Sequence, residues 1–513
     1  MNNFPRRLSG ILIIAATLVI TAACLTGTIA TESSQFEQPS NHANTQPKPT
    51  LTRTPPFTMP TRLPGAARLT PTPDTPRVLP TLRKDSVDYQ VEANDTLARI
   101  STRYGISLNA LISANEISNP DLISLGQVLV VPPVSPVGNA PVNKILPDSE
   151  LVYGPASTLL DAESFIKSQG GYLASYSEEV SGEDLSGIEI VTRVSREYSV
   201  NPRVLLALLE FQSQWLTGKK PSEISLEYPL LYKVSYRKGL YPQLIWAANN
   251  LNRGYYLWKA NAIGHYILAD DSVIATSSGI NPGTAAVQYL MSLFYGKAEW
   301  ESAVSEQGFK RTFEKLFGDP FDFTLDPLVP ETLTQPVLQL PFEEGAIWSF
   351  TGGPHAGWGD GSAWAAIDFA PPGDALGCVT NDAWVTAAAG GLVTRSENGV
   401  VVVDLDLDGY DQTGWTLLYL HIETRNRVAV GTLLTAGDRI GHPSCEGGVS
   451  TGTHVHFARR YNGEWIAADG NLPFILEGWT SQGSGVEYDG FLVRDEQKIE
   501  AWEGRLPENQ IQR

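Results

Sequence analysis

Basic residues are scarce in this 513-residue chain. It has 37 lysines and arginines against 56 aspartates and glutamates, which gives a formal net charge of −19 at pH 7. A nucleic-acid partner needs a basic face to meet its phosphates, so the composition argues against one. Hydrophobic residues make up 42% of the chain and charged residues 18%, and the length suits roughly three domains of about 150 residues.

Long apolar runs are also missing, apart from one near the start. Residues 11–23 form an apolar run that is short for a membrane span, and Ala22-Ala23 then precede Cys24. This arrangement resembles the lipobox of bacterial lipoproteins. The resemblance implies a signal peptide over residues 1–24, lipidation of Cys24 and a membrane lipid anchor at the extracytoplasmic face or cell wall. The alternatives are an ordinary signal peptide, or an uncleaved anchor if the run extends to Ala30.

Cysteine is rare, with three residues in the whole chain. If Cys24 carries lipid, Cys378 and Cys445 remain as an even pair. Exported proteins mature in an oxidising environment, so we expect this pair to form a disulfide. Two buried free thiols are the alternative.

Aromatic and β-branched apolar residues are sparse over residues 25–87, where proline, threonine and serine dominate. Such a segment cannot bury enough apolar area to offset its ordering entropy. The composition predicts a disordered, semi-stiff linker that acts as a spacer.

Residues 88–133 have a different pattern. DYQVEA is strand-like, Leu97, Ile100 and Tyr104 lie at helical spacing, SLNALISANEI repeats that spacing, and GQVLVVPP is typical of a closing strand. The segment therefore predicts the order strand, helix, helix, strand.

The same segment resembles a LysM module. The motifs that carry the resemblance are Asp95-Thr96-Leu97, Tyr104-Gly105-Ile106, Asn119-Pro120-Asp121 and Gly126-Gln127. The resemblance implies a βααβ module that binds N-acetylglucosamine-containing glycans such as peptidoglycan. The implied glycan-binding residues lie in two loops and are Asp95, Thr96, Asn119, Pro120 and Asp121. The alternative is that these residues only shape turns.

Residues 150–325 predict a mainly helical domain of unknown role, with Asn201-Pro202 as one helix start. The segment LLALLEFQSQW is faintly similar to the catalytic helix of lysozyme-like lytic transglycosylases, which place a general-acid Glu just before a Ser. Here Gln212 precedes Ser213, and an amide cannot donate a proton as a carboxylic acid can. We therefore expect a packing or glycan-contacting domain, with a displaced catalytic Glu210 as the alternative.

Glycine becomes frequent over residues 340–480, where strand-like runs such as GVVVVDLD and TLLYLHI alternate with turns. This pattern predicts a mostly antiparallel β domain. The more polar residues 481–513 are interpreted as a C-terminal extension. The expected fold class is thus multidomain α+β.

Five of the seven histidines lie between residues 355 and 456. His454 and His456 alternate within THVHF, so both side chains should point to one face of a strand. Asp368 stands within the apolar segment AAIDFAPP, and a buried carboxylate needs a cation partner. A catalytic zinc site needs three protein ligands and an open position for water, which this cluster can supply. Unrelated surface or core histidines are the alternative.

This region resembles the lysostaphin and β-lytic family of zinc endopeptidases, and more closely its staphylolysin branch. That branch places its first His after Gly-Gly-Pro and thirteen residues before the Asp. Here Gly352-Gly353-Pro354 precedes His355, and 368 − 355 = 13. The commoner spacing in the family would place the His at Trp364. Ser450-Thr451-Gly452-Thr453 also matches the family's approach to its His-x-His strand.

The resemblance implies that His355, Asp368 and His456 hold one Zn²⁺ per chain and that His421 and His454 form the catalytic pair. The implied reaction is zinc-assisted hydrolysis of a peptide bond. In it, the two histidines handle the proton of the attacking water and stabilise the oxyanion, in an order that the sequence leaves open.

Two further features near this cluster have no family role. His442 is interpreted as a loop residue, with a place beside Cys445 in the cleft as the alternative. Asp404, Asp406 and Asp408 are spaced like the start of a calcium loop, but Trp415 occupies the position of its closing Glu. We interpret this segment as an acidic hairpin turn.

These features predict an exported zinc metalloendopeptidase that hydrolyses peptide bonds in peptidoglycan and is held at the wall by its LysM module. One alternative is a non-catalytic wall-binding or regulatory protein with a peptidase-like fold, although such relatives usually lose metal ligands. Another is an enzyme that acts on Gly-rich proteins rather than on the wall. The oligomeric state is left open.

Overall fold

The computed structural model describes residue 71 and residues 74–513, which belong to one compact unit. The predicted signal peptide, Cys24 with its lipidation, and most of the predicted linker lie outside the described residues. Within the described part of the chain, no helix is both long and apolar enough to cross a bilayer.

The N-terminal module contains β1 (Val87–Gln90), α1 (Leu97–Tyr104), α2 (Leu108–Ala114) and β2 (Val128–Val131), with β1 antiparallel to β2. Thr96 caps α1 by accepting a hydrogen bond from the Arg99 N–H, and Gly105 ends it at a φ of 62°. The predicted βααβ order is confirmed.

Residues 74–86 precede this module and contact the helical region. The backbone N–H groups of Asp74 and Arg77 donate to the carbonyls of Gly279 and Ser278, both at 3.2 Å. The Arg77 guanidinium also donates to the Trp258 carbonyl at 2.7 Å. The disorder that we predicted for the linker therefore does not extend to this stretch.

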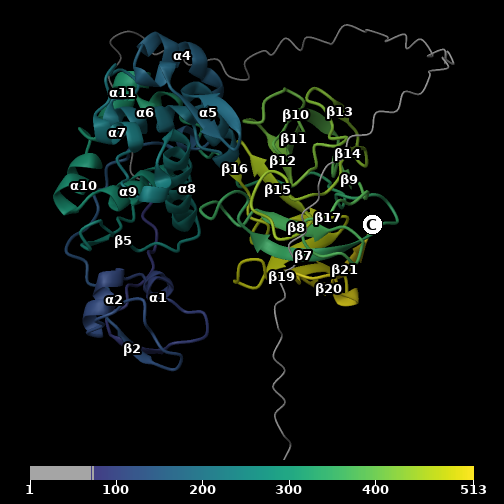
Figure 1. Cartoon of the computed structure of the whole chain (residues 1–513), viewed down its shortest axis with the longest axis horizontal. Helices are drawn as coiled ribbons and strands as arrows, with labels where there is room; N and C mark the ends of the chain where they lie inside the picture. The colour runs from purple at the N-terminus through teal and green to yellow at the C-terminus, as the bar shows by residue number, and fades with distance from the viewer. Residues whose placement is uncertain (1–70, 72–73) are drawn as a thin grey trace, which may run out of the picture. The chain divides into compact units, whose positions relative to one another are not determined.

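The helical region, coloured blue to teal in Figure 1, follows the module along the chain and precedes the C-terminal domain. Its α-helices are α3 (Asp148–Leu151), α4 (Ala162–Gln169), α5 (Gly187–Tyr198), α6 (Pro202–Ser213), α7 (Glu223–Glu227), α8 (Leu240–Lys259), α9 (Pro282–Phe294), α10 (Lys297–Ala303) and α11 (Phe309–Phe317). Two small hairpins accompany them, β3 (Ser177–Val180) with β4 (Glu183–Ser186) and β5 (His265–Ile267) with β6 (Val273–Ala275). The predicted mainly helical domain is confirmed.

Local sequence explains where these helices begin. Asn201 caps α6 by accepting from the Arg203 N–H, and Pro202 occupies the first helical position. Ser186 and Glu189 form a capping box at the start of α5. The first eight of the twelve residues of α6 are buried, which fits the almost continuous apolar sequence there.

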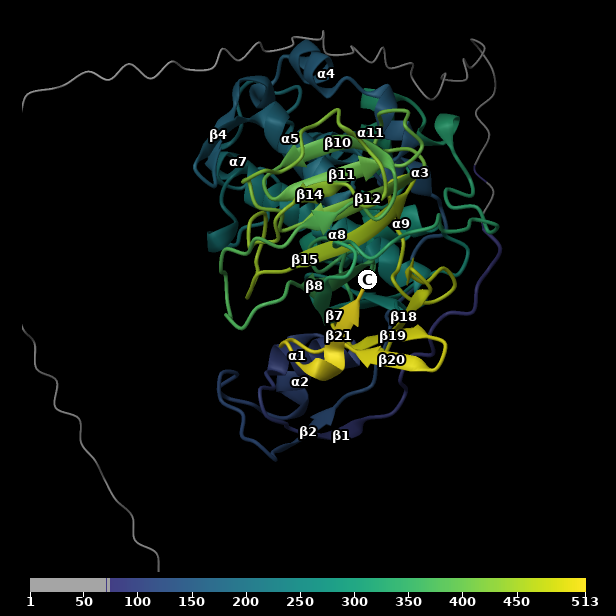
Figure 2. The ribbon, with the colours of Figure 1, turned by 90° about the vertical axis from the view of Figure 1, so that its right-hand side faces the viewer.

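The C-terminal domain is built on a nine-stranded sheet in which all neighbouring strands are antiparallel. The order is β13 (Leu433–Leu434), β10 (Gly391–Glu397), β11 (Val400–Asp404), β12 (Trp415–Leu420), β15 (Val455–Tyr461), β8 (Ala366–Ala370), β7 (Ile347–His355) and β21 (Gln510–Gln512), and β16 (Glu464–Trp465) pairs with β15. Figure 2 shows β10, β11, β12 and β15 side by side. The predicted antiparallel β domain is confirmed.

The last residues of the chain belong to this domain. A second sheet contains β17 (Ile475–Leu476), β18 (Trp479–Gly483), β19 (Gly490–Arg494) and β20 (Gln497–Glu500), while β9 (Val385–Thr386) pairs with β14 (Arg439–Gly441). The boundary that we predicted at residue 480 cuts through β18, and β21 adds a strand to the main sheet. Residues 481–513 therefore complete the β domain rather than extend from it.

Both faces of the main sheet are covered. Alternate residues on β11, β12 and β15 belong to the domain's own core, namely Val401, Val403, Leu417, Tyr419 and Phe457. Their neighbours, Val400, Val402, Leu418, Leu420 and Ala458, share a core with residues of α5, α6, α8 and α9. The period of two along each strand thus divides the sheet between two cores.

Candidate metal centre

The three predicted metal ligands lie on three adjacent strands. His355 ends β7, Asp368 lies in β8 between β7 and β15, and His456 lies in β15 directly across from Asp368. Opposite Asp368 on β7 stands Gly352, where a Cβ atom would lie 2.8 Å from the carboxylate. The glycine therefore leaves room for the carboxylate to turn toward the histidines.

The ligand atoms converge on one point. The distance is 3.2 Å from His355 Nε2 to Asp368 Oδ1, 3.3 Å from His456 Nδ1 to the same oxygen, and 2.9 Å between the two nitrogens. All three residues are buried, and Oδ1 has no hydrogen-bond partner among the described residues. Ligands in a tetrahedral zinc site are about 3.3 Å apart, given metal–ligand distances of about 2.0–2.2 Å. The trio therefore fits Zn²⁺.

Backbone carbonyls orient the two histidine ligands. His355 Nδ1 lies 2.8 Å from the Gly353 carbonyl oxygen, and His456 Nε2 lies 3.1 Å from that of Gly357. A carbonyl accepts only from a protonated nitrogen, so the other nitrogen of each ring keeps its lone pair. Those free nitrogens are the two that face Asp368. Such outer partners fix the tautomer and orientation of metal-binding histidines.

The electrostatics keep the carboxylate ionised. Burial alone would raise the pKa of Asp368, but its interactions with His355, His454 and His456 lower it well below its usual value. Burial lowers the pKa of His456 against the opposing effect of Asp368. Burial would also lower the pKa of His355, but Asp368 raises it above its usual value. An anionic oxygen with imidazole nitrogens is a donor set that zinc accepts.

The predicted catalytic pair lies beside this trio. His454 Nε2 is 3.6 Å from Asp368 Oδ2, and the rings of His421 and His454 are 4.5 Å apart between centroids. His454 Nδ1 faces the Gly452 carbonyl at 2.7 Å, and His421 Nδ1 faces that of Glu446 at 2.8 Å. Burial and the two neighbouring histidines lower the pKa of His421 to about 3. A neutral imidazole with a free Nε2 can accept a proton.

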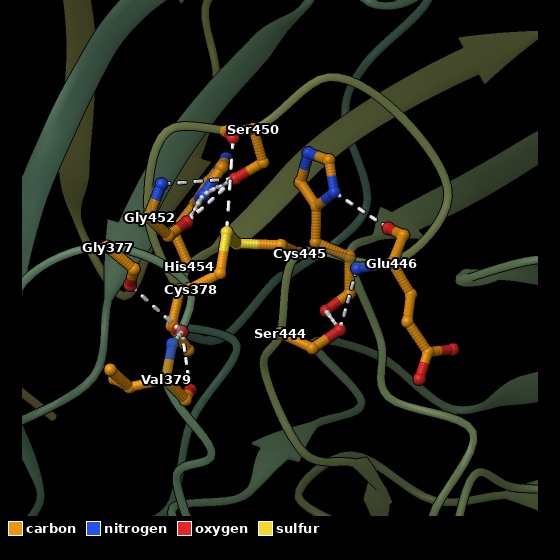
Figure 3. The surroundings of a disulfide bond; sticks show 11 residues. Gly377, Cys378, Val379, Ser444, Cys445, Glu446, Ser450, Gly452 and His454 are labelled. Carbon is orange, nitrogen blue, oxygen red and sulfur yellow. Dashed lines mark hydrogen bonds between the residues drawn. A yellow bond between two sulfur atoms is a disulfide. The ribbon is translucent and has the colours of Figure 1, made fainter. Parts of the chain in front are cut away.

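A disulfide joins two loops that contact this pair, the loop after β8 with Cys378 and the loop before β15 with Cys445 (Figure 3). Cys445 follows Ser444, whose N–H donates to the His421 carbonyl at 2.7 Å. Cys378 lies between Gly377 and Val379, and both of these bind Thr453, the residue before His454. The structure therefore places the predicted pair Cys378 and Cys445 in a bond beside the site.

These residues line a cleft of about 1260 Å³ that includes all five of the predicted metal and catalytic residues. Tyr488, which the sequence reasoning missed, also lines it, and its ring stacks on His355 at 4.2 Å between centroids. Burial, together with Asp368 and Glu487, raises the pKa of Tyr488 to about 12. No motif marks this tyrosine, because it lies in the segment that we interpreted as an extension.

The helical region supplies part of the same cleft. Arg193, Glu197 and Tyr198 of α5 and Tyr241 of α8 line it together with the β domain. Glu197 accepts from the Arg193 guanidinium at 3.1 Å and from the Tyr241 hydroxyl at 3.3 Å. A ligand in this cleft would therefore meet both regions.

The predicted glycan-binding residues have local structural partners. Asp95 accepts from the Tyr89 hydroxyl at 2.6 Å and the Glu92 N–H at 2.8 Å, and Thr96 caps α1. Asn119 accepts from the Asp121 N–H at 3.1 Å, and Asn119, Pro120 and Asp121 are exposed. The turn-shaping alternative thus has direct contacts, while the glycan role stays a prediction.

Glu210 and Gln212, the two residues that the sequence singled out in the helical region, bind other parts of that region. Glu210 accepts from the Leu216 and Thr217 N–H groups at 3.2 and 3.1 Å and so ties down the segment after α6. The Gln212 amide oxygen accepts from the Tyr295 hydroxyl at 2.6 Å. Both side chains have structural partners, as we expect for a packing domain.

The other two features that the sequence analysis singled out have local partners. His442 is buried against Trp384, with ring centroids 3.9 Å apart, and faces the Ala383 carbonyl at 3.0 Å. Asp404 accepts from the N–H groups of Asp406 and Gly409 in the turn between β11 and β12. The interpretation of this segment as an acidic hairpin turn agrees with those bonds.

Three family models match the chain. They are "LysM domain" over residues 89–132, "LasA, N-terminal domain" over residues 144–330, and "Peptidase family M23" over residues 367–468. The second falls on the helical region, to which the sequence reasoning assigned no family beyond a faint lysozyme-like similarity.

The chain is also similar to two named proteins and to one solved structure. Protease LasA of Pseudomonas aeruginosa (strain UCBPP-PA14) is 28% identical over 348 residues, which cover 63% of this chain and 75% of that protein. Beta-lytic metalloendopeptidase of Lysobacter enzymogenes is 28% identical over 155 residues, 30% of this chain and 83% of that protein. The solved M23 metalloprotease pseudoalterin is 24% identical, covering 33% of this chain and 97% of its own, with a TM-score of 0.28. The predicted combination of a LysM module with a lysostaphin/β-lytic-type peptidase domain is confirmed.

Proposed function

We propose that this chain, which carries a LysM module and an M23-type peptidase domain, is an exported zinc metalloendopeptidase that hydrolyses peptide bonds in peptidoglycan. One observation carries the proposal. His355 Nε2, Asp368 Oδ1 and His456 Nδ1 converge on one buried point, and two further histidines line the same cleft. The LysM module would hold the enzyme at the wall through its glycan strands.

Export is part of the proposal. The basic start, the short apolar run and Cys24 support a lipoprotein-type signal and a lipid anchor at the extracytoplasmic face. A disulfide between Cys378 and Cys445 suits an oxidising compartment.

We assign metal binding to three residues of the cleft and proton transfer to two others. When bound, Zn²⁺ would supply a Lewis acid that acidifies a water and polarises the scissile carbonyl. His355, Asp368 and His456 would hold it, with Gly353 and Gly357 fixing the rings. His421 and His454 each present Nε2 once Nδ1 is held by a carbonyl, so one can accept the proton of the water. The other can stabilise the developing oxyanion once its ring also carries a proton on Nε2.

Zymography on purified cell walls tests this function. We expect a lysis band from the parent and none from His456→Ala or from a chelator-treated sample, with recovery when Zn²⁺ is returned. His42→Ala, in the predicted linker, serves as the matched histidine control and should keep full lysis. If lysis persists in His456→Ala and in chelator, the zinc mechanism is wrong.

Two other outcomes of these assays would favour a different function. A parent that binds zinc but lyses no wall would favour a non-catalytic wall-binding or regulatory protein. Cleavage of Gly-rich proteins without cleavage of wall peptides would favour a protein substrate.

A further inference from the structure

We propose that Asn249, on α8 of the helical region, is a positioning residue for the metal centre. It holds residues 356–362, here called the clamp loop, and the clamp loop in turn orients the ligand His456. The inference deepens the proposed function and rests on it, because it concerns the same metal site.

The clamp loop is joined directly to the metal centre. It begins immediately after His355, and its Gly357 carbonyl accepts from His456 Nε2 at 3.1 Å. The Gly357 N–H donates to the Ala363 carbonyl at 3.0 Å, which closes the loop on itself. A Cβ on Gly357 would lie 2.6 Å from the Trp465 ring, so the carbonyl has little room to move. Displacement of this loop would therefore turn the His456 ring.

Asn249 forms hydrogen bonds with Asp360 and Gly361 of the clamp loop. Its Oδ1 accepts from the N–H groups of Asp360 and Gly361 at 3.1 and 3.0 Å, and its Nδ2 donates to the Asp360 carboxylate. Arg253, one turn later on α8, pairs with that carboxylate at 2.7 Å and donates to the Asp360 carbonyl at 3.2 Å. One amide thus uses both its acceptor and its donor on the clamp loop.

Two glycines of the clamp loop allow its backbone to lie close to α8. Gly359 has a φ of 63°, and a Cβ there would lie 2.5 Å from Asn249 Oδ1. A Cβ on Gly361 would lie 2.0 Å from the Asn249 carbonyl oxygen, which is closer than real side chains approach. Only glycine permits the backbone to come this near α8. The glycines and the asparagine thus form one matched contact.

The contact between Asn249 and the clamp loop should affect how tightly the metal site binds its metal. Outer partners of metal-binding histidines typically change metal affinity by about 10- to 100-fold when removed. Because the Gly357 carbonyl is such a partner, loss of the Asn249 grip should weaken metal binding although Asn249 touches no ligand.

A reciprocal exchange tests the contact. Asn249→Ala should raise the dissociation constant for Zn²⁺ by about tenfold or more and alter the visible spectrum of bound Co²⁺. Asn249→Asp should do at least the same, since it sets two carboxylates against each other. Adding Asp360→Asn should restore much of the affinity, because the carboxylate at position 249 still accepts two N–H groups and the new amide can donate to it.

The control lies on the same helix. Asn250 is buried, and within the part of the chain that the structure describes its side chain donates only to the Trp246 carbonyl of α8. Asn250→Ala therefore removes an asparagine hydrogen bond from α8 without touching the clamp loop and should leave Zn²⁺ affinity and the Co²⁺ spectrum unchanged. All variants are made in the full chain, with thermal unfolding measured alongside.

The outcomes separate the two proposals. Three results would overturn the positioning role. Asn249→Ala could bind Zn²⁺ and Co²⁺ as the parent does, Asn250→Ala could lose as much Zn²⁺ affinity as Asn249→Ala, or the double variant could recover no affinity. A parent that binds Zn²⁺ but lyses no wall would overturn the proposed activity and leave the positioning result standing. A parent that binds neither Zn²⁺ nor Co²⁺ would overturn both.

Discussion

The histidines of the cleft differ in which ring nitrogen a backbone carbonyl holds. His355, His421 and His454 present Nδ1 to a carbonyl, whereas His456 presents Nε2 to Gly357. His456 can therefore meet the Asp368 oxygen with Nδ1, while His421 and His454 keep Nε2 for proton transfer. At this scale, the carbonyl partner decides which ring nitrogen is available, and the position of the ring relative to Asp368 separates the two proposed ligands from the proposed catalytic pair.

The first prediction concerns the catalytic pair. His421→Ala and His454→Ala should each lower the rate of wall-peptide hydrolysis by about 10²–10⁴-fold, the range typical of general acid–base groups. Both variants should retain one zinc per chain, because neither residue supplies a converging ligand atom. Elemental analysis of the purified variants, run beside His456→Ala as the metal-deficient comparison, checks this. Loss of zinc from His454→Ala equal to that from His456→Ala would contradict the division of roles.

The sequence indicated those site residues that lie close together along the chain, within a recognisable motif. His355 and Asp368 are 13 residues apart, and His454 and His456 share one strand-like segment. Tyr488 stacks on His355 from 133 residues later, and Asn249 reaches the clamp loop from 111 residues earlier. Neither contact has a local pattern, because both depend on how distant elements pack.

Elements with a clear hydrophobic pattern, whether periodic or a continuous apolar run, were predicted. Elements without such a pattern were not. β11 and β12 are almost continuously apolar because both faces of the sheet are buried, and the predicted strands there are confirmed. β18 to β20 are more polar, and nine of their fourteen residues are not buried, so their sequence resembled an extension. β21 buries only Ile511 and is recognisable only from its pairing with β7.

The second prediction concerns the loops that the disulfide joins. The double variant Cys378→Ser/Cys445→Ser should lower kcat by about tenfold at a temperature where it stays folded, because the loops beside His421 and His454 lose their shared anchor. Its zinc content should equal that of the parent, since the ligands lie on strands. A disulfide closing a loop of this size typically contributes about 2–5 kcal/mol, so Tm should also fall. An unchanged kcat would mean that hydrogen bonds alone hold the pair.

The third prediction concerns the contact between β5 and the N-terminal module. His265 Nε2 lies 2.7 Å from the Gly105 carbonyl, while its buried Nδ1 has no hydrogen-bond partner among the described residues. Burial lowers the pKa of His265 despite the opposing carbonyl, and the charge of Arg83 lowers it further. A depressed histidine pKa means that the folded contact binds fewer protons than the open one. The contact should therefore weaken as pH falls through 6.5.

Hydrogen exchange at the start of α2 measures this effect. Exchange should accelerate between pH 7 and pH 5, after correction for the intrinsic pH dependence of exchange. His265→Gln, which keeps a donor but does not titrate, should remove the pH dependence. Equal acceleration in parent and variant would assign the effect to another group.

At the scale of the whole molecule, the β domain and the helical region share one core. Val400, Val402, Leu418 and Leu420 are at most 8% exposed and pack in the same cluster as residues of α5 and α8. Polar contacts cross the same boundary, since Glu464 accepts from the Tyr255 hydroxyl at 2.9 Å and Ser199 donates to the Gly463 carbonyl at 2.6 Å. The two regions are therefore expected to unfold together.

The last prediction follows from this shared core. Burying one large aliphatic side chain contributes about 1.5–3 kcal/mol, so a fragment of residues 330–513 alone would expose a face whose burial contributes at least about 5 kcal/mol. The fragment should unfold at least about 10 °C below the full chain, given about 2–4 °C per kcal/mol for a domain of this size. It should also bind a hydrophobic dye, and Val402→Thr/Leu418→Thr should reduce that binding in the fragment while destabilising the full chain. A fragment with the Tm of the full chain and no dye binding would show that the sheet does not need its helical cover.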